Sequence, residues 1–332
     1  MGVDVSVIIP AYNRADLIGH TLDSILGQTL APAEVIVVDD GSTDSTEAVV
    51  RNYAPRVRYL KIENSGECRA RNVGVAASSS DWIAFCDSDD LWHKDKLSRQ
   101  VKLFESAPDV QYAFTNFRTV TNDQWSQATK FDSSPRGYWD LPKRQLADDL
   151  FVVETPMYKS LLTHQPIFPS TVMMRRTYFE EVGRCNEPLG HTLAMDWEFA
   201  LRCVNRSHIG VVSAPVVGIR KHLSNFSRDL LLGTLGELTI LRYLLDHHPV
   251  TREEQLLIRD QIVIRSASGA EGAFAKGDFK TMRELLAAVP GNRRSWKLRL
   301  KALIGRCPTE VGKFLQRSAT SAGGSAGLQA PR

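Results

Sequence analysis

The sequence has few cysteines, and none of them stands in a C-x-x-C motif. Its 332 residues include five cysteines that are odd in number and widely spaced: Cys68, Cys86, Cys185, Cys203 and Cys307. This spacing argues against a disulfide framework and against a structural zinc site. We therefore expect the protein to work in a reducing compartment.

Long hydrophobic runs are also missing. No apolar stretch approaches the roughly 18 residues that a membrane-spanning helix needs. The opening segment MGVDVSVIIPAYN has no basic residue before its apolar run, and that run has the length of a strand, so we expect no signal sequence. We expect a cytoplasmic protein, with peripheral attachment to the inner face of the membrane as an alternative.

Neither sign of charge dominates the chain. The 41 Lys and Arg against 38 Asp and Glu give a formal net charge of +3, which does not indicate a nucleic-acid partner, and we expect none. There is no G-x-G-x-x-G motif after the first apolar run and no G-x-x-x-x-G-K-[ST] motif anywhere. Both absences argue against a dinucleotide-binding protein and a P-loop protein.

Short apolar runs alternate with segments of helical period between Val5 and Phe114. The runs VSVIIP, EVIVVDD, VRYLKI, WIAFCD and VQYAF are candidate strands, and RADLIGHTLDSILGQT carries an apolar stripe at helical spacing. This alternation predicts a parallel sheet with helices on both faces. We expect long loops and short helices over residues 121–169, and mostly helices over residues 229–315.

Polar residues follow three of the candidate strands. They occupy residues 10–13, 39–42 and 87–90. Ligands of such sheets bind outside the carboxyl ends of the strands, so we expect the three segments to meet in one crevice. In the last segment, Asp87, Asp89 and Asp90 repel one another unless a cation compensates their charge. A divalent metal would provide that cation, and the alternative is a polar loop that caps the next helix.

Four segments, in this order and spacing, resemble the family 2 glycosyltransferases. They are VSVIIPAYNRADLIGHTLDSILGQT, EVIVVDDGSTDST, ARNVGVAASSSDWIAFCDSDDLW and MDWEFALR, and the resemblance runs from about Val5 to about Arg228. It implies an α/β fold of the GT-A type, with a Rossmann-like, mostly parallel sheet flanked by helices. It also implies an inverting enzyme that uses a nucleotide-sugar donor.

The resemblance implies a nucleotide site at the ends of the first two strands. The residues that match the nucleotide-contacting loop are Pro10, Ala11, Tyr12 and Asn13. Asp40 matches the carboxylate that recognises the base, and its alternative role is a turn residue or the cap of the following helix. Asp39 is expected to be structural. Arg71, with Arg69 and Asn72, matches a segment that approaches the donor, and a solvated helix face is the alternative.

The segment DSD, residues 87–89, matches the D-x-D motif of the family. The match implies that carboxylates hold Mn²⁺ or Mg²⁺ against the donor phosphates, because such ions prefer oxygen ligands. Asp89 is the predicted metal ligand, and Asp87 is predicted to contact metal and donor, with Ser88 beside it. Asp90 is expected either to contact the metal or to interact with the N-terminus of a helix that starts near His93, and the sequence favours neither role. His222 is predicted to reach the metal or the diphosphate, with a structural histidine as the alternative.

Asp196, in HTLAMDWEFALRC, matches the general base of the family. Transfer with inversion needs a base that takes the proton from the acceptor hydroxyl as that hydroxyl attacks the sugar. The alternative is a helix N-cap. Many members carry an acidic pair at this point, but here Met195 leaves Asp196 as the only carboxylate of the pair.

The acceptor is not specified by any motif. We expect a UDP-sugar as donor and a glycan or a lipid-linked glycan as acceptor. Trp92, Trp125 and Trp139 are candidates for stacking on sugar rings, with core packing as the alternative. The basic segment 291–317, in which apolar residues are interleaved, is either a membrane contact or a solvated helix. A homodimer is left open.

We expect three regions along the chain. Residues 1–228 form a catalytic domain, with a donor half over about 1–115 and an acceptor half over 116–228, followed by a helical region over 229–317 and a disordered tail over 318–332. The predicted function is divalent-metal-dependent transfer of a sugar to a hydroxyl acceptor. A nucleotidyltransferase, which releases pyrophosphate, and a non-catalytic nucleotide-sugar-binding protein are the alternatives.

Overall fold

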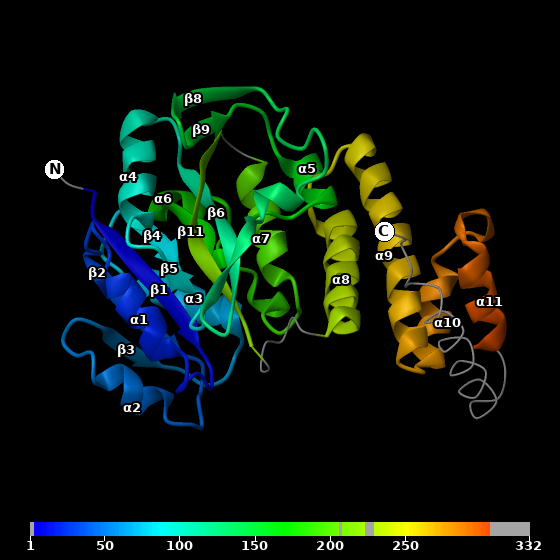
Figure 1. Cartoon of the computed structure of the whole chain (residues 1–332), viewed down its shortest axis with the longest axis horizontal. Coiled ribbons are helices and arrows are strands. Elements are labelled where there is room, and N and C mark those ends of the chain that lie inside the picture. The colour runs from blue at the N-terminus through cyan, green and yellow to red at the C-terminus, as the bar shows by residue number, and fades with distance from the viewer. Residues whose placement is uncertain (1–2, 206–207, 223–228, 306–332) are drawn as a thin grey trace, which may run out of the picture. The chain divides into compact units, whose positions relative to one another are not determined.

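The computed structural model describes residues 3–205, 208–222 and 229–305. The chain divides into two compact units, Met1–Asn225 and Phe226–Arg332, which are drawn in Figure 1. The predicted tail over 318–332 and the second part of the basic segment, 306–317, lie outside the described residues. The division expected after residue 228 stays a prediction.

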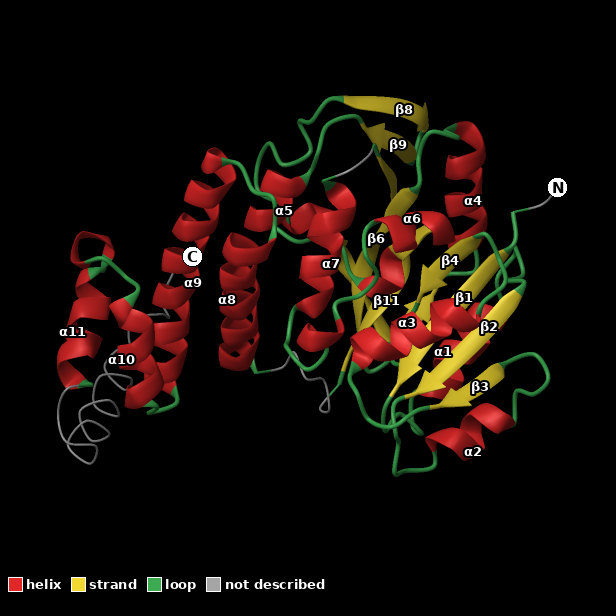
Figure 2. Ribbon diagram, turned by 180° about the vertical axis from the view of Figure 1, so that it is seen from behind, coloured by secondary structure: helices red, strands yellow, loops and turns green. Residues whose placement is uncertain are grey.

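In its described residues, the first unit is built on one mixed sheet of eleven strands (Figure 2). The strand order is β3-β2-β1-β4-β10-β6-β11-β9-β8, while β5 pairs with β11 and β7 pairs with β6. Strands β3, β2, β1 and β4 are parallel to one another, and β10 is antiparallel to both of its neighbours, β4 and β6. The strands are β1 (Val5–Ala11), β2 (Glu34–Asp39), β3 (Arg58–Lys61), β4 (Trp82–Phe85), β5 (Leu91–Trp92), β6 (Tyr112–Thr121), β7 (Gln124–Thr129), β8 (Lys143–Ala147), β9 (Leu150–Val153), β10 (Val172–Arg175) and β11 (Ile209–Lys221).

Helices cover both faces of this sheet, as the sequence predicts. In the first unit they are α1 (Ile18–Leu26), α2 (Thr46–Arg51), α3 (Glu67–Ala77), α4 (Lys96–Ser106), α5 (Tyr158–Thr163), α6 (Arg176–Glu181) and α7 (Met195–Val204). Short 3₁₀ turns are η1 (Phe131–Ser133), η2 (Pro169–Thr171) and η3 (Glu187–Leu189). The helices and the strand order together give the expected GT-A arrangement, in which helices flank a parallel core.

Strand β1 is buried along its whole length because its two faces meet different helices. Val7 and Ile9 belong to one core with the apolar side chains of α1 and α4. Ile8 points to the opposite face, since successive side chains of a strand alternate. There it meets α3 at Gly74, where an added Cβ would lie 2.3 Å from Ile8 Cγ2. This close approach holds α3 and its polar residues near the carboxyl ends of β1 and β4.

One expectation about local structure is wrong. The segment 121–169 contains the paired strands β7, β8 and β9 as well as the short helix α5, instead of only loops and helices. Strand β9 forms because it pairs with β11, more than fifty residues later, which no local pattern reveals. The helix expected near His93 is present: it begins at Lys96, after Leu91 and Trp92 have paired with β11.

The described part of the second unit, residues 229–305, consists of helices with their own core. They are α8 (Leu230–His247), α9 (Arg252–Ala275), α10 (Phe279–Ala287), the 3₁₀ turn η5 (Gly291–Arg293) and α11 (Trp296–Ile304). Leu238, Phe274 and Met282 are among the residues that pack together in this core. Helix α9 begins at a capping box in which Thr251 and Glu254 satisfy each other's backbone N–H groups. Within the described ranges, no helix is long and apolar enough to cross a bilayer.

Candidate active site

The polar segments after β1 and β2 are in contact. The Asn13 side-chain oxygen accepts from the backbone N–H of Thr43 at 2.9 Å, and the Asn13 N–H donates to the Ser42 hydroxyl at 2.9 Å. Ala11 accepts from the Asp40 N–H at 2.8 Å. Pro10 and Ala11 are buried within β1, and Tyr12 is 37% exposed. The first two predicted segments therefore form one surface at the edge of the sheet.

Asp40 ties this surface to the start of α3. Its buried carboxylate accepts from the backbone N–H groups of Ser65, at 2.7 Å, and Gly66, at 2.9 Å. The alternative role was a turn residue or the cap of the helix that follows Asp40, and neither Ser65 nor Gly66 lies in that turn or helix. Each carboxylate oxygen keeps a further lone pair for a ligand, so base recognition stays a prediction. Asp39 has the structural role expected for it, because its carboxylate accepts from the Ser42 N–H and the Tyr59 hydroxyl.

The acidic segment after β4 is a tight turn. The Asp90 N–H donates to the carbonyl of Asp87 at 3.1 Å, and the Ser88 carbonyl accepts from the Thr21 hydroxyl at 3.0 Å. Asp90 is buried, and this burial raises the pKa of its carboxyl well above the usual value. Its partners are Ser170 and Arg220, so it does not interact with the start of α4. Asp90 therefore stabilises the turn itself. This role differs from the two expected ones, which were contact with the metal and contact with the start of α4.

Asp89 is partly buried at this turn, with 14% of its side chain exposed, and faces His222. The Asp89 Oδ2 atom lies 2.9 Å from His222 Nε2 and 3.6 Å from the Nε of Arg14. No group of three or more His, Cys, Asp or Glu side chains that could hold a metal gathers among the described residues. The Asp89 carboxylate nevertheless suits Mn²⁺ or Mg²⁺, because these ions are commonly held by one or two carboxylates together with substrate phosphates, and His222 places an imidazole nitrogen beside it.

Arg71 is buried, with 3% of its side chain exposed, which contradicts the alternative of a solvated helix face. Its Nη2 donates to Asp87 at 2.7 Å and to Glu67 at 3.0 Å. Burial raises the pKa of Asp87 to about 7, although the Arg71 guanidinium opposes this shift. The two neighbours that matched the same segment lie differently: Arg69 is exposed and pairs with Glu187, and Asn72 binds the backbone of Cys185.

Asp196 lies in the first turn of α7, two residues after the N-cap, which is Ala194. It is therefore not the N-cap that the alternative role requires. Burial raises the pKa of Asp196 to about 6, and the positive charge of Arg71 partly opposes this rise. A carboxyl with this pKa is ionised at neutral pH and is more basic than an exposed aspartate.

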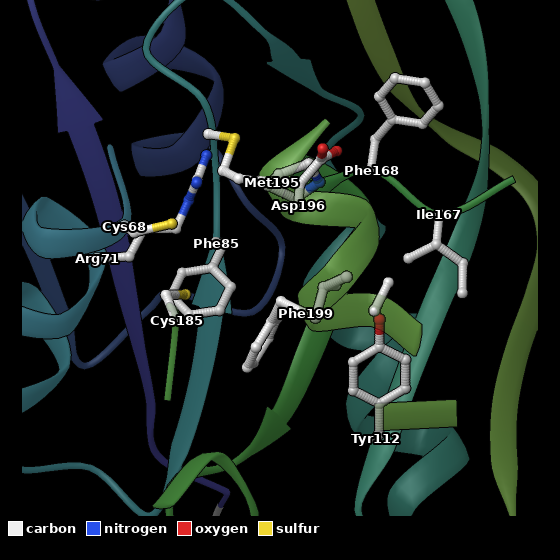
Figure 3. A pocket seen from close by; sticks show the side chains of 13 residues that line it. Cys68, Arg71, Phe85, Tyr112, Ile167, Phe168, Cys185, Met195, Asp196 and Phe199 are labelled. Carbon is white, nitrogen blue, oxygen red and sulfur yellow. The ribbon is translucent and has the colours of Figure 1, made fainter. Parts of the chain in front are cut away.

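Asp196 and Arg71 line one pocket and reach it from different helices, as Figure 3 shows. Most of the other lining side chains are apolar or aromatic: Phe85, Ile167, Phe168, Val172, Met195 and Phe199. Tyr112 also lines the pocket. In the described part of the chain, neither the Tyr112 hydroxyl nor the Nε of Arg71 has a hydrogen-bond partner. The pocket thus combines an ionisable carboxylate with two buried donors in apolar surroundings.

The three tryptophans proposed for sugar stacking differ in exposure. Trp92 is buried, its Nε1 donates to the Ser170 carbonyl at 3.0 Å, and Lys96 Nζ lies 3.6 Å from its ring centroid. This agrees with the alternative of core packing. Trp139 packs on Phe131 with ring centroids 4.2 Å apart. Trp125 is 37% exposed, and is the most accessible of the three.

Two residues near the site were not predicted. Arg14, beside Asp89, directly follows the predicted loop residue Asn13, so its position in the sequence was an available signal. Ser170 contacts the acidic turn from η2, eighty residues farther along the chain. No local pattern indicates this contact, because it depends on how β10 pairs with β4.

Sequence comparison identifies a family for most of the first unit. The family model described as glycosyl transferase family 2 matches residues 6–183. The putative teichuronic acid biosynthesis glycosyltransferase TuaG of Bacillus subtilis is 40% identical over 124 residues, which are 36% of this chain and 48% of that protein. The succinoglycan biosynthesis protein ExoO of Rhizobium meliloti is 40% identical over 122 residues, or 36% of this chain and 35% of that protein. The match spans about half or less of the length of these two relatives.

Solved structures show the same fold at low identity. S. aureus TarS 1-349 in complex with UDP-GlcNAc has a TM-score of 0.60 and 18% identity, over 96% of this chain and 92% of that chain. The mannosyltransferase PcManGT from Pyrobaculum calidifontis, in complex with GDP-Man and Mn²⁺, has a TM-score of 0.54 and 19% identity, over 97% of this chain and 86% of that chain. These likenesses confirm the expected fold. Because the family model covers more than half of the sequence, the chain belongs to glycosyl transferase family 2.

Proposed function

We propose that the protein transfers a sugar, with inversion, from a nucleoside diphosphate sugar to a hydroxyl acceptor. One observation carries this proposal. Asp196 lines the same pocket as Arg71, and Arg71 binds Asp87 of the acidic turn at 2.7 Å. A candidate base and a candidate site for the donor diphosphate are thereby linked through one buried side chain, as the reaction requires.

The nucleotide would bind where β1 and β2 end. Asp40 has lone pairs for the N–H donors of a base, and the exposed ring of Tyr12 lies at the same edge. A UDP-sugar is the proposed donor. The structure of TarS with UDP-GlcNAc and that of PcManGT with GDP-Man support a nucleoside diphosphate sugar in general.

Asp89 and His222 would hold Mn²⁺ or Mg²⁺, with Asp87 close to the same ion. The Mn²⁺ in the PcManGT complex supports a metal in this fold. The ion, when bound, stabilises negative charge that develops on the leaving diphosphate. Arg71 orients Asp87, and Arg14 lies close enough to Asp89 to interact with a phosphate that approaches this carboxylate.

Asp196 would act as the general base. Its pKa of about 6 leaves it ionised at neutral pH, yet basic enough to accept a proton from the acceptor hydroxyl during attack. Most of the side chains that line the pocket around this carboxylate are apolar.

The proposed acceptor is a glycan or a lipid-linked glycan. TuaG and ExoO carry names from teichuronic acid and succinoglycan biosynthesis, which supports a role in the synthesis of a polysaccharide. No described side chain specifies the acceptor sugar or the linkage. A homodimer stays a prediction that light scattering can test.

The first half of the predicted membrane segment includes α11. Trp296, Leu300 and Leu303 are 71%, 48% and 60% exposed, and their spacing places them on one helix face. Lys297 and Arg299 are exposed on the same helix, which contains no acidic residue. We propose that this face binds an anionic membrane surface, close to a lipid-linked acceptor.

Release of nucleoside diphosphate tests the proposed reaction. UDP-, GDP- and dTDP-sugars are incubated with the protein in Mn²⁺, Mg²⁺ or chelator, with and without a candidate acceptor. We expect release from one donor that is abolished by chelator and by Asp89→Asn, while the exposed control Asp81→Asn behaves like wild type. Release of pyrophosphate would indicate a nucleotidyltransferase, and donor binding without turnover under any condition would indicate a non-catalytic protein.

Vesicle sedimentation tests the membrane face. We expect binding to phosphatidylglycerol vesicles, little binding to phosphatidylcholine vesicles, and about tenfold weaker binding for Trp296→Ser, because a buried tryptophan side chain contributes over 1 kcal/mol. Leu256→Ser is the matched control, since Leu256 is 62% exposed on α9 of the same unit. Equal binding of wild type and Trp296→Ser would contradict the proposal.

A further inference from the structure

Ser170 contacts both ends of the acidic turn. Its hydroxyl accepts from the backbone N–H of Asp87 at 2.9 Å and donates to Oδ2 of Asp90 at 2.5 Å. These are the two residues that close the turn through the bond from the Asp90 N–H to the Asp87 carbonyl. Asp89 lies between them, at the third position of the turn. One fully buried hydroxyl thus fixes both ends of the turn that presents Asp89.

Asp90 extends this arrangement to β11. Its other oxygen, Oδ1, accepts from the backbone N–H of Arg220 at 3.0 Å. Asp90 directly follows Asp89 in the chain, and Arg220 stands two residues before His222. The bond therefore joins the backbone segments that carry Asp89 and His222, whose side chains are 2.9 Å apart.

Ser170 is itself held firmly in place. Its carbonyl accepts from Trp92 Nε1 at 3.0 Å, and the carbonyl of Thr171 accepts from Gln100 Nε2 at 3.0 Å. The Thr171 hydroxyl closes the 3₁₀ turn η2 by donating to the carbonyl of Phe168. Trp92, Gln100, Ser170 and Thr171 are all buried. Ser170 can therefore impose a geometry on the acidic turn, because hydrogen bonds from β5 and α4 hold the backbone of η2 in place.

We propose that Ser170 and Asp90 are positioning residues that set the separation of Asp89 and His222 for a divalent cation. This inference rests on the proposed metal site and deepens it. Outer hydrogen bonds that orient metal ligands typically change metal affinity about 10- to 100-fold when they are removed. Ser170 and Asp90 act here through hydrogen bonds to the turn and to β11, without touching the cation.

Two measurements on the whole chain test the proposal. The first is Mn²⁺ binding in the presence of UDP, followed by electron paramagnetic resonance of free Mn²⁺. We expect Ser170→Ala and Asp90→Ala each to raise the Mn²⁺ dissociation constant about tenfold. Ser170→Thr keeps the hydroxyl and should restore binding toward the wild-type value.

The second measurement is amide hydrogen exchange by mass spectrometry, which needs no metal. Ser170→Ala should speed exchange in peptides that contain Asp87, and Asp90→Ala should speed exchange in peptides that contain Arg220. Ser78→Ala is the matched control: Ser78 is a buried serine whose hydroxyl binds the carbonyl of Val75 at 2.7 Å, at the far end of α3. It should change neither exchange at the turn nor Mn²⁺ affinity.

The outcomes separate this inference from the proposed function. Wild-type Mn²⁺ affinity in both alanine variants would overturn the positioning role. If wild type itself binds no Mn²⁺ with UDP, the proposed metal site fails. Unchanged hydrogen exchange in the variants would show that the hydrogen bonds of Ser170 and Asp90 do not hold the turn and β11 either. Should Ser170→Ala not fold, Asp90→Ala tests the same arrangement from the opposite end.

Discussion

The guanidinium of Arg71 donates a hydrogen bond of 2.7 Å to the carboxylate of Asp87. Arg71 comes from the buried face of α3, and Asp87 begins the turn after β4. Burial raises the pKa of Asp196, which lies on α7, and the same guanidinium partly opposes this rise. One buried cation therefore influences both the acidic turn and the candidate base. The pair with Asp87 and the role of Asp196 can be tested separately.

Arg71→Gln should lower the free energy of unfolding by about 3 kcal/mol, because it removes a buried cation and leaves the Asp87 carboxylate, 30% exposed, without its partner. Urea denaturation measures this loss. The control is Arg69→Gln on the same helix, whose exposed pair with Glu187 should contribute less than about 1 kcal/mol. Equal losses in the two variants would contradict the structural importance of the buried pair.

Asp196→Asn should reduce sugar transfer at least about 100-fold, because the amide cannot accept the proton of the acceptor hydroxyl. Affinity for the donor should change little, since Asp196 is not placed against the nucleotide. Steady-state rates and donor titration measure the two effects. Asp246→Asn, at an exposed position of α8, controls for the loss of one negative charge. Near-normal transfer in Asp196→Asn would show that another group is the base.

The rate of transfer should rise with pH through about 6. Burial raises the pKa of Asp196 to about 6, so the carboxyl is protonated and inactive as a base below this pH and ionised above it. Glu67 contributes to the raised pKa, and Glu67→Gln should therefore move the acidic limb of the profile to lower pH. The control is Glu63→Gln, an exposed residue just before α3. A limb that does not move in Glu67→Gln would mean that another group controls it.

Asp40→Ala should destabilise the protein by about 2 kcal/mol, because two backbone N–H groups at the start of α3 lose their acceptor. Asp40→Asn retains one acceptor oxygen and should lose less stability. If Asp40 also recognises the base, both variants lose UDP affinity when they are measured in the folded state by calorimetry. Wild-type UDP affinity in Asp40→Asn would restrict this residue to its structural role.

Much of the first unit follows from local pattern. The apolar runs that became β1, β2 and β4 are buried on both faces, and the stripe around Leu22 became the buried side of α1. Because these strands are parallel, their carboxyl ends meet at one edge, and the polar segments after them could be expected there. The strands β7, β8 and β9 could not be predicted, because their pairing partners supply the hydrogen bonds that make them strands.

The roles of individual carboxylates were harder to foresee. Asp87, Asp89 and Asp90 are nearly equivalent in the sequence, yet the structure binds them to Arg71, His222 and Ser170 respectively. The partners come from α3, from the residue directly after β11, and from η2. A local pattern cannot distinguish the three residues, because each difference depends on a segment far away in the chain.

The sequence by itself determined the family, the order of the main elements and the edge of the sheet where polar residues gather, because hydrophobic periodicity and motif order are local properties. The tertiary structure alone decided which carboxylate is held by Arg71, which faces His222 and which is clamped by Ser170. Burial, charge pairing and hydrogen bonding act between segments that only folding brings together, and they give chemically identical side chains different surroundings.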